Sequence, residues 1–336
     1  MGELRMKTYS IKLSIGLPVY NGERFLAQAL DSLLSQTFTD FELIISDNAS
    51  TDRTADICQE YAQKDQRIRY FRNATNIGCA CNFNRVLQLA KGEYFKWAAY
   101  DDLHAPNFLA RCIEILDKYP SYILCHSRTK LIDEQGNLLQ DYAIKLKTYL
   151  PLPQQRFNEL LTKHFCYQLY GVMRRSALEK IPPMGGYGNA DGILLLRLGL
   201  IGCFYEIPEY LFFARSHPQQ SLSMFFPDYL SFNDNNPRFS LHMLPNFYEY
   251  AVWFDSQNKD KLLFPHWRLL GEYLQTINHS SMNWYARLCC YISIVKKLTG
   301  TESLLIKDLV FALQKMVTKT WKIFHRDNLP DSSLAN

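Results

Sequence analysis

The sequence has little of three features that would assign it to a class at once: paired cysteines, an apolar leader and an excess of charge. Nine cysteines are scattered without a C-x-x-C pair, which argues against a disulfide framework and a structural zinc site. Residues 1–13 contain no apolar stretch of signal-peptide length, so we expect a cytoplasmic protein. A net charge of +4 does not by itself indicate nucleic-acid binding, and we expect no nucleic-acid partner.

The composition is that of a soluble globular protein. Hydrophobic residues make up 47% and charged residues 21% of the 336 positions, which argues against disorder and against a multi-span membrane protein. This length allows one large α/β domain, or such a domain with a helical extension.

Strand and helix patterns alternate over residues 12–101. Runs of β-branched, apolar or aromatic residues predict four strands, and helical patterns follow the first three; the runs are 12–20, 41–47, 67–73 and 93–101. Successive strand-then-helix units predict a parallel sheet with right-handed crossovers. We therefore expect an α/β fold with a mostly parallel, Rossmann-like sheet flanked by helices.

Polar residues follow each of these predicted strands. In a parallel sheet the carboxyl ends of the strands meet at one edge, where open α/β sheets bind nucleotides. The residues that we expect at this edge are Tyr20, Asn21, Asp47, Asn76 and Asp101.

Asp101 and Asp102 end an aromatic run and are the first candidates for a chemical centre. Two carboxylates at a strand end suit a hard divalent cation such as Mg²⁺ or Mn²⁺, shared with the phosphate oxygens of a substrate. The pattern also fits a plain helix start, in which Asp102 caps a helix entered through Pro106. The pair alone leaves both interpretations open.

The middle of the chain is less regular. We expect a helix over 106–118, a strand over 122–128, a strand over 165–173 and a helix over 193–201 that follows a flexible glycine-rich loop and Asp191. Residues 204–214 contain Pro208, which predicts two short strands or an edge strand.

The pattern of the sequence changes after about residue 225, from mixed strand and helix signals to a linker followed by mainly helical signals. We expect one domain over 1–225, in two halves at about 1–106 and 107–225. Residues 228–238 are typical of a linker, 226–326 of a mainly helical region and 327–336 of a disordered tail.

The last predicted helix, 303–324, carries an apolar face and a basic stripe formed by Lys315, Lys319, Lys322 and Arg326. A solvated basic face over a packed apolar one is the commoner explanation, and we favour it. Peripheral contact with an anionic membrane through 303–326, or with a second subunit in a homodimer, stays open.

The order of these motifs resembles family 2 glycosyltransferases with the GT-A fold, over about residues 13–223. The resemblance is carried by LPVYNGERFLAQALDSLLSQTFTDFELIISDNASTD, NIGCACNFN, GEYFKWAAYDDLHAPNFL, the Asp191 loop and ARSHPQQS. It implies an inverting, metal-dependent enzyme, of the hexosyltransferase class, that moves a sugar from a nucleotide-sugar, most simply a UDP-sugar. The implied acceptor is a hydroxyl of a glycan or lipid-linked molecule, in bacterial surface polysaccharide or glycoconjugate synthesis on the inner side of the membrane.

The resemblance makes residues 1–225 a catalytic domain, with a donor-binding half at about 1–106 and an acceptor-side half at about 107–225. It also implies a role for each matching residue. Those at donor-binding positions are Pro18, Tyr20, Asn21, Glu23, Asp47, Asn76, Tyr100, Asp101 and Arg215. Asp101 matches the direct ligand of an Mn²⁺ or Mg²⁺ ion, Asp102 its support, and His217 a position that contacts the metal or the diphosphate. Asp191 matches the catalytic base, which takes the proton of the acceptor hydroxyl. Without the resemblance, turns and helix caps would explain several of these residues equally well.

Two positions depart from the family pattern. Ala99 stands where the D-x-D motif has its first acid, and Phe83 stands where many relatives have an arginine. The first departure weakens the expected contacts to the donor more than those to the metal. Both motivate the alternative of a nucleotide-sugar binder without transfer activity. A sugar-1-phosphate nucleotidyltransferase is a further alternative, although residues 17–23 hold a single glycine where that class carries a glycine-rich basic loop.

Overall fold

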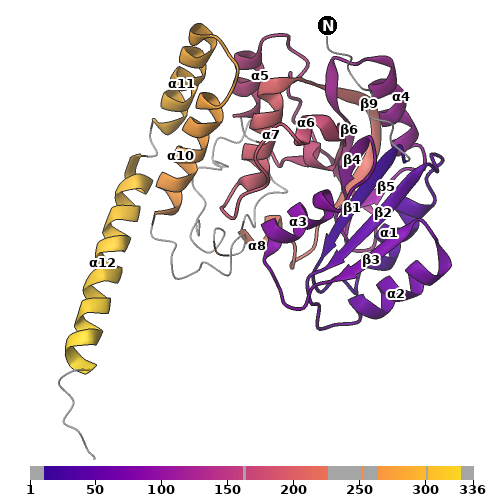
Figure 1. Cartoon of the computed structure of the whole chain (residues 1–336), viewed down its shortest axis with the longest axis horizontal. Helices are drawn as coiled ribbons and strands as arrows, with labels where there is room; N and C mark the ends of the chain where they lie inside the picture. Colours follow the sequence, from indigo (N-terminus) through magenta and orange to yellow (C-terminus); the bar gives the residue numbers. More distant parts are fainter. Residues whose placement is uncertain (1–10, 162–163, 226–251, 253–263, 300–301, 327–336) are drawn as a thin grey trace, which may run out of the picture.

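The computed structural model describes residues 11–161, 164–225, 252, 264–299 and 302–326. Within them a nine-stranded sheet has the order β3-β2-β1-β4-β8-β6-β9-β5, and β7 pairs with β6 (Figure 1). The strands are β1 (Leu13–Val19), β2 (Phe41–Asp47), β3 (Ile68–Arg72), β4 (Tyr94–Trp97), β5 (Leu103–His104), β6 (Tyr122–Ile132), β7 (Leu138–Asp141), β8 (Val172–Arg174) and β9 (Cys203–Arg215).

The first four strands are all parallel, as the strand-then-helix pattern predicts. Every residue of β1 and β2 is buried, because helices cover both faces of this half of the sheet. The helices between these strands are α1 (Leu26–Leu34), α2 (Thr54–Lys64) and α3 (Cys79–Gln88). The α/β prediction is therefore confirmed.

The second half of the sheet is mixed. Strand β8 is antiparallel to β4 and β6, β9 is parallel to β6, and β5 is antiparallel to β9. The helical elements of this half are α4 (Phe108–Lys118), α5 (Pro153–Leu160), the 3₁₀ turn η1 (Tyr167–Tyr170), α6 (Arg175–Leu178), α7 (Ala190–Ile201) and α8 (Ser221–Phe225).

Two hydrophobic clusters lie on the two faces of the sheet. One joins β1 and β2 to α1 and α4 and includes Leu30 and Leu116. The other joins β4 and β8 to α3, α5 and α7 and includes Val86 and Phe157. Helix α7 is buried on all sides at Ile193–Leu196, which is why its sequence shows hardly any polar face.

The expected strand over 165–173 is wrong for most of its length. Cys166 has a left-handed φ of 56°, which breaks an extended chain, and η1 follows at once. Only Val172–Arg174 pairs as a strand, between β4 and β6.

Of the two alternatives for residues 204–214, two short strands is wrong, because the residues belong to one 13-residue strand, β9. The edge-strand alternative is confirmed around Pro208, since β9 pairs with β6 along its length but with β5 only at Phe212 and Phe213. Its register against β6 shifts between Ile207 and Tyr210, so the residues skipped are Pro208 and Glu209. The bulge tolerates a proline that cannot donate a ladder hydrogen bond.

The described residues beyond 263 form three helices, α10 (Pro265–Asn278), α11 (Trp284–Leu298) and α12 (Glu302–Arg326). Ile277 of α10 and Cys290 and Ile294 of α11 join the cluster around α7. In the described part of the chain, no helix has both the length and the apolar character needed to cross a membrane. The predicted linker 228–238 and the predicted tail 327–336 lie outside the described residues, and the division at 225 stays a prediction.

Candidate active site

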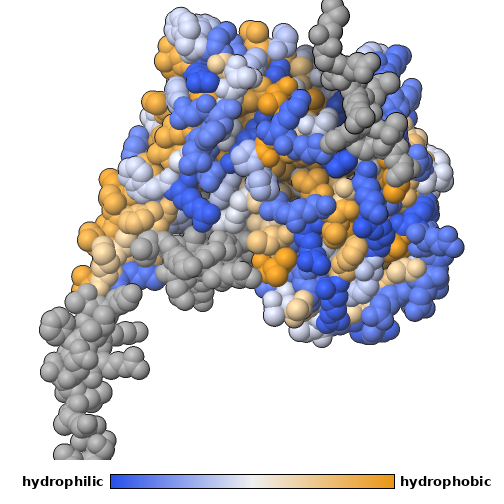
Figure 2. All heavy atoms as spheres, viewed as in Figure 1, coloured by the Kyte–Doolittle hydropathy of each residue, from blue (hydrophilic) through white to orange (hydrophobic). Residues whose placement is uncertain are grey.

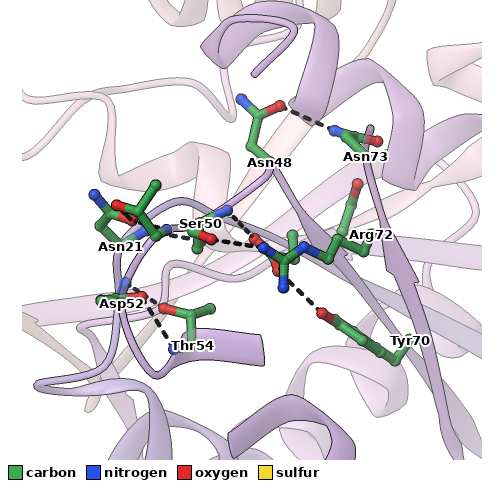
Figure 3. Close-up of polar contacts among 12 residues, drawn as sticks. Asn21, Asn48, Ser50, Asp52, Thr54, Tyr70, Arg72 and Asn73 are labelled. Carbon is green, nitrogen blue, oxygen red and sulfur yellow. Dashed lines mark hydrogen bonds and ion pairs between the residues drawn. The ribbon is translucent and has the colours of Figure 1, made fainter. Parts of the chain in front are cut away.

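The loops after β1 and β2 are tied together at the carboxyl edge of the sheet (Figure 3). Asn21 has a left-handed φ of 50°, and its side-chain oxygen accepts a hydrogen bond from the amide of Thr51 at 2.8 Å. The amide of Asn21 donates to Ser50 Oγ at 3.0 Å. Tyr20, which precedes this turn, is 44% exposed, so its ring is accessible for stacking on a flat ligand.

Glu23 extends the same contact between the two loops. Its amide donates to Asp52 Oδ2 at 3.1 Å, and its carboxylate accepts from the amide of Arg53 at 2.9 Å. The amide of Gly22 donates to Thr54 Oγ1 at 2.8 Å. Glu23 therefore holds the first helical turn of α2 against the β1 loop.

Asp47 is fully buried at the end of β2, behind this surface. Its carboxylate accepts from the amide of Ser50 at 2.8 Å and from the hydroxyl of Tyr70 at 3.0 Å, and Arg72 lies 3.6 Å from it. Figure 3 shows Tyr70 and Arg72, which both come from β3, and Arg72 donates to the carbonyl of Ser50 at 2.8 Å. In the structure, Asp47 stabilises the loop after β2 through these hydrogen bonds. Its contact with a donor stays a prediction.

A network of asparagines, which the sequence interpretation missed apart from Asn76, continues this edge. Asn48 donates to Asn76 Oδ1 at 2.8 Å and accepts from Asn73 Nδ2 at 2.9 Å. Asn76 Oδ1 also accepts from the amide of Gly78 at 2.9 Å, directly before α3. The signal was an asparagine after each of β2 and β3, where a short amide side chain can bond to neighbouring loops.

Tyr100 connects the acid pair to the β1 loop. A Cβ on Gly22 would come within 2.8 Å of the Tyr100 ring, so the close approach of these two segments requires a glycine. The charges of Asp101, Asp102 and Asp52 add to burial in raising the pKa of Tyr100. Of the predicted donor-side residues, the structure thus brings Tyr20, Asn21, Glu23, Asn76 and Tyr100 to one sheet edge.

Asp101 and Asp102 lie between β4 and β5, because the chain leaves the sheet at Trp97, earlier than predicted. Asp101 Oδ2 is 2.9 Å from Nε2 of His217, which lies just beyond β9. Asp102 Oδ1 accepts from the amide of Arg215 at 2.9 Å. Burial, together with the charge of Asp101, raises the pKa of Asp102 well above its ordinary value.

Arg215 is buried completely and holds four segments together. Its Nε donates to the carbonyl of Asp101 at 2.8 Å, its Nη1 to that of Glu134 at 2.7 Å, and its Nη2 to Gln28 Oε1 at 2.8 Å. These hydrogen bonds link the guanidinium to other segments of the protein. A direct contact of this guanidinium with a donor stays a prediction.

The acid pair offers carboxylate oxygens, which suit Mn²⁺ or Mg²⁺, and His217 adds an imidazole nitrogen. Asp101 and His217 are already side by side, and Nδ1 of His217 is buried without a hydrogen-bond partner among the described residues. In that part of the chain, no three His, Cys, Asp or Glu side chains are grouped to hold a metal ion alone. Metal binding at Asp101 and His217 stays a prediction.

Asp191 is the second residue of α7, after Asn189 in a left-handed conformation with φ 65°. Its Oδ1 accepts from the amide of Gly192 at 2.9 Å. Burial raises the pKa of Asp191, while hydrogen bonds from Gly192 and the thiol of Cys166 act in the opposite direction. A raised pKa suits a base that must hold a proton during the reaction.

Tyr170 is the last residue of η1. Burial raises its pKa, and the charges of Asp102, Asp101 and Asp191 raise it further. Its ring stacks on Phe212, with centroids 5.5 Å apart.

Lys96 is another residue that the sequence did not point to. It is fully buried in β4, and its ammonium donates to the carbonyls of Trp97 at 3.0 Å and Tyr170 at 2.5 Å. Burial lowers the pKa of Lys96 to about 7. The available signal was a lysine inside the aromatic run 94–97, because a lysine is seldom fully buried unless its ammonium has partners.

Comparisons with known proteins agree with this architecture. An uncharacterized glycosyltransferase of Rickettsia typhi, RT0329, is 35% identical over 157 residues, 46% of this chain and 45% of that protein. The Rickettsia prowazekii protein RP339, also an uncharacterized glycosyltransferase, is 26% identical over 308 residues, 90% of this chain and 78% of that protein. The chain thus spans less than half the length of the R. typhi relative.

The solved structure of S. aureus TarS 1–349 in complex with UDP covers 88% of this chain and 90% of its own, with a TM-score of 0.51 at 16% identity. This likeness confirms the GT-A-like fold expected from the sequence. Residues 14–182 match Glycosyl transferase family 2, and they hold β1 to β4, the acid pair and η1. The chain therefore belongs to glycosyl transferase family 2.

Proposed function

We propose that the protein is an inverting glycosyltransferase that moves a sugar, of the hexose class, from a UDP-sugar to a hydroxyl of a glycan or lipid-linked acceptor. The Asp101–His217 pair, 2.9 Å apart in a chain of glycosyl transferase family 2, is the observation that carries this proposal. An inverting transfer also needs a base on the side of the sugar opposite the leaving diphosphate, and Asp191 is proposed for that role.

The donor nucleotide is proposed to bind at the loops after β1 and β2. The exposed ring of Tyr20 offers a stacking surface, and the Asn21 turn is fixed by Ser50 and Thr51 before any ligand arrives. Such pre-organisation lowers the entropic cost of binding. S. aureus TarS has been solved with UDP and with UDP-GlcNAc, which makes UDP-sugars the first donors to test.

Asp101 and His217 are proposed to hold a divalent cation, with Asp102 in support. When bound, Mn²⁺ or Mg²⁺ neutralises the charge that develops on the leaving diphosphate. The protein groups position this site through Arg215, whose amide and guanidinium fix Asp102 and the carbonyl of Asp101.

Asp191 is proposed as the base. Its carboxylate takes the proton of the acceptor hydroxyl while that oxygen forms a bond to the anomeric carbon. The bond from this carbon to the diphosphate oxygen breaks on the opposite face, and the nucleoside diphosphate leaves with the electron pair. Two hydrogen bonds between Asn84 and the main chain of Met184, at 2.8 and 3.0 Å, hold the loop before Asp191 against α3.

The proposed setting is the cytoplasm, in synthesis of a bacterial surface polysaccharide or glycoconjugate. The test is slow hydrolysis of a panel of nucleotide-sugars by purified protein, with and without Mn²⁺. We expect hydrolysis of at least one UDP-sugar, stimulated by the metal. If no nucleoside diphosphate binds and no donor is hydrolysed, the proposed enzyme activity is wrong.

A further inference from the structure

The C-terminal helices present a large apolar surface to solvent, away from the candidate active site. Trp284 is 75% exposed and Val317 is 67% exposed. The set here named the C-terminal apolar surface is Trp284, Tyr285, Leu288, Ile292 and Val295 on α11 and Ile306, Leu309, Val310, Leu313, Met316 and Val317 on α12. Phe311 on α12 is also exposed, but helical spacing places it on another face of that helix.

Helical spacing places each set on one outward face. Successive members are mostly three or four residues apart, so they form a stripe along each helix. The opposite side of α11 is packed, since Ala286, Cys290 and Ile294 are buried. Helix α12 attaches to α10 through Asp308, whose carboxylate lies 2.7 Å from Nδ1 of His266. The stripes are therefore what remains after both helices have packed.

The two helices lie along one outer edge of the molecule. Figure 1 shows α11 and α12 on the side of α10 that faces away from the sheet. Figure 2 shows hydrophobic side chains gathered along this same edge. Patches of this extent are uncommon on a free protein surface and usually mark a site of association.

The charge of this region points to the kind of partner. Residues 284–326 contain eight Lys or Arg against two Asp or Glu, whereas the whole chain has a net charge of +4. The rest of the chain is therefore slightly acidic, and the positive charge is concentrated beside the apolar surface. Lys296 and Lys307 follow directly on the exposed apolar residues Val295 and Ile306.

We propose that the C-terminal apolar surface docks on an anionic lipid bilayer, with α11 and α12 lying in the plane of its interface. An amphipathic helix with Trp and Tyr on the apolar side and Lys and Arg beside it binds in this manner. A second copy of the chain fits less well, because it would bring two strongly basic regions together. The inference is independent of the proposed sugar transfer.

The test is co-sedimentation of the full chain with vesicles. We expect binding to phosphatidylcholine vesicles that contain phosphatidylglycerol, and much weaker binding to phosphatidylcholine alone or at high salt. The variant Trp284→Ser/Val295→Ser/Leu313→Ser should lose binding. The variant Lys296→Glu/Lys307→Glu should weaken it roughly tenfold or more.

Matched controls lie elsewhere on the surface. Leu138→Ser/Leu139→Ser removes two exposed leucines of the β6–β7 hairpin, and Lys118→Glu/Lys180→Glu reverses two exposed lysines. Both controls should bind as the unaltered protein does, and all variants should keep its melting temperature. Equal binding by the triple serine variant, or no binding of the unaltered protein to anionic vesicles, overturns the proposal. Concentration-dependent dimers that the serine variant abolishes, without vesicle binding, would assign the surface to a second copy instead.

Discussion

The carboxylate of Asp102 accepts a hydrogen bond from the main-chain amide of Arg215 at 2.9 Å, across 113 residues of sequence. This contact fixes the end of β9, and with it His217, against the acid pair. It also leaves Asp102 buried beside the charge of Asp101, which is costly when both are ionised. We therefore expect the ionised acid pair to lower the stability of the folded protein.

Replacing Asp102 with a neutral residue should therefore raise the free energy of unfolding. A carboxyl whose pKa is raised on folding holds its proton more readily in the folded state, so stability falls as pH rises above its ordinary pKa of 3.8. Asp102→Asn keeps an oxygen acceptor and removes the charge. We expect its free energy of unfolding near neutral pH to be roughly 1–4 kcal/mol higher than that of the unaltered protein, the range seen when buried ionic groups are replaced by neutral ones. Urea unfolding in EDTA from about pH 4 to about pH 8 measures this. Parallel curves for the two proteins would contradict the prediction.

Asp191→Asn should separate donor binding from transfer. Donor affinity should stay unchanged, while the rate of transfer or donor hydrolysis should fall by about 10²–10⁴, the usual contribution of a general base. Because burial raises the pKa of Asp191, the acid limb of the kcat profile should lie above pH 3.8, with activity lost as pH falls. Asp56→Asn on the exposed side of α2 is the control. Normal turnover by Asp191→Asn would remove this residue from the proposed role.

Asp101→Ala should abolish the part of UDP binding that depends on Mn²⁺ or Mg²⁺. His217→Gln should weaken metal-dependent binding by about 10–100-fold, because it keeps a polar group but not the imidazole. Titration calorimetry with and without the metal measures both effects. Binding of UDP without metal, which we propose to involve the Asn21 turn, should survive in both variants. If metal still tightens UDP binding to Asp101→Ala as it does for the unaltered protein, the cation is held elsewhere.

Lys96 should give the protein a characteristic dependence of stability on pH. Burial lowers the pKa of Lys96 to about 7, so between that value and its ordinary 10.5 the unfolded chain binds the extra proton. Stability from this group therefore rises with pH across that window. In Lys96→Met, the free energy of unfolding should lack this rise relative to the unaltered protein. The difference between the two proteins, measured by urea unfolding at several pH values, isolates Lys96 from the thiols that titrate in the same range. A constant difference would show that Lys96 stays charged or solvated.

The sequence by itself determined the parallel half of the sheet and the residues at its edge. The signals were local: strand periodicity, glycine and asparagine at the turns, and the order of the motifs. Such patterns can be identified from the sequence without a structure. They placed Asn21, Asp47, Asn76 and the acid pair after the correct strands.

Only the tertiary structure decided which polar groups of these residues remain available. Arg215 and Asp47 look like ligand-binding residues in the sequence, yet their side chains bond to partners in other segments of the protein. The 3₁₀ turn at Tyr167–Tyr170 replaces a predicted strand, and the ammonium of Lys96 fixes its last carbonyl. These contacts join residues far apart in the chain, and their free energy depends on burial, which no local pattern encodes.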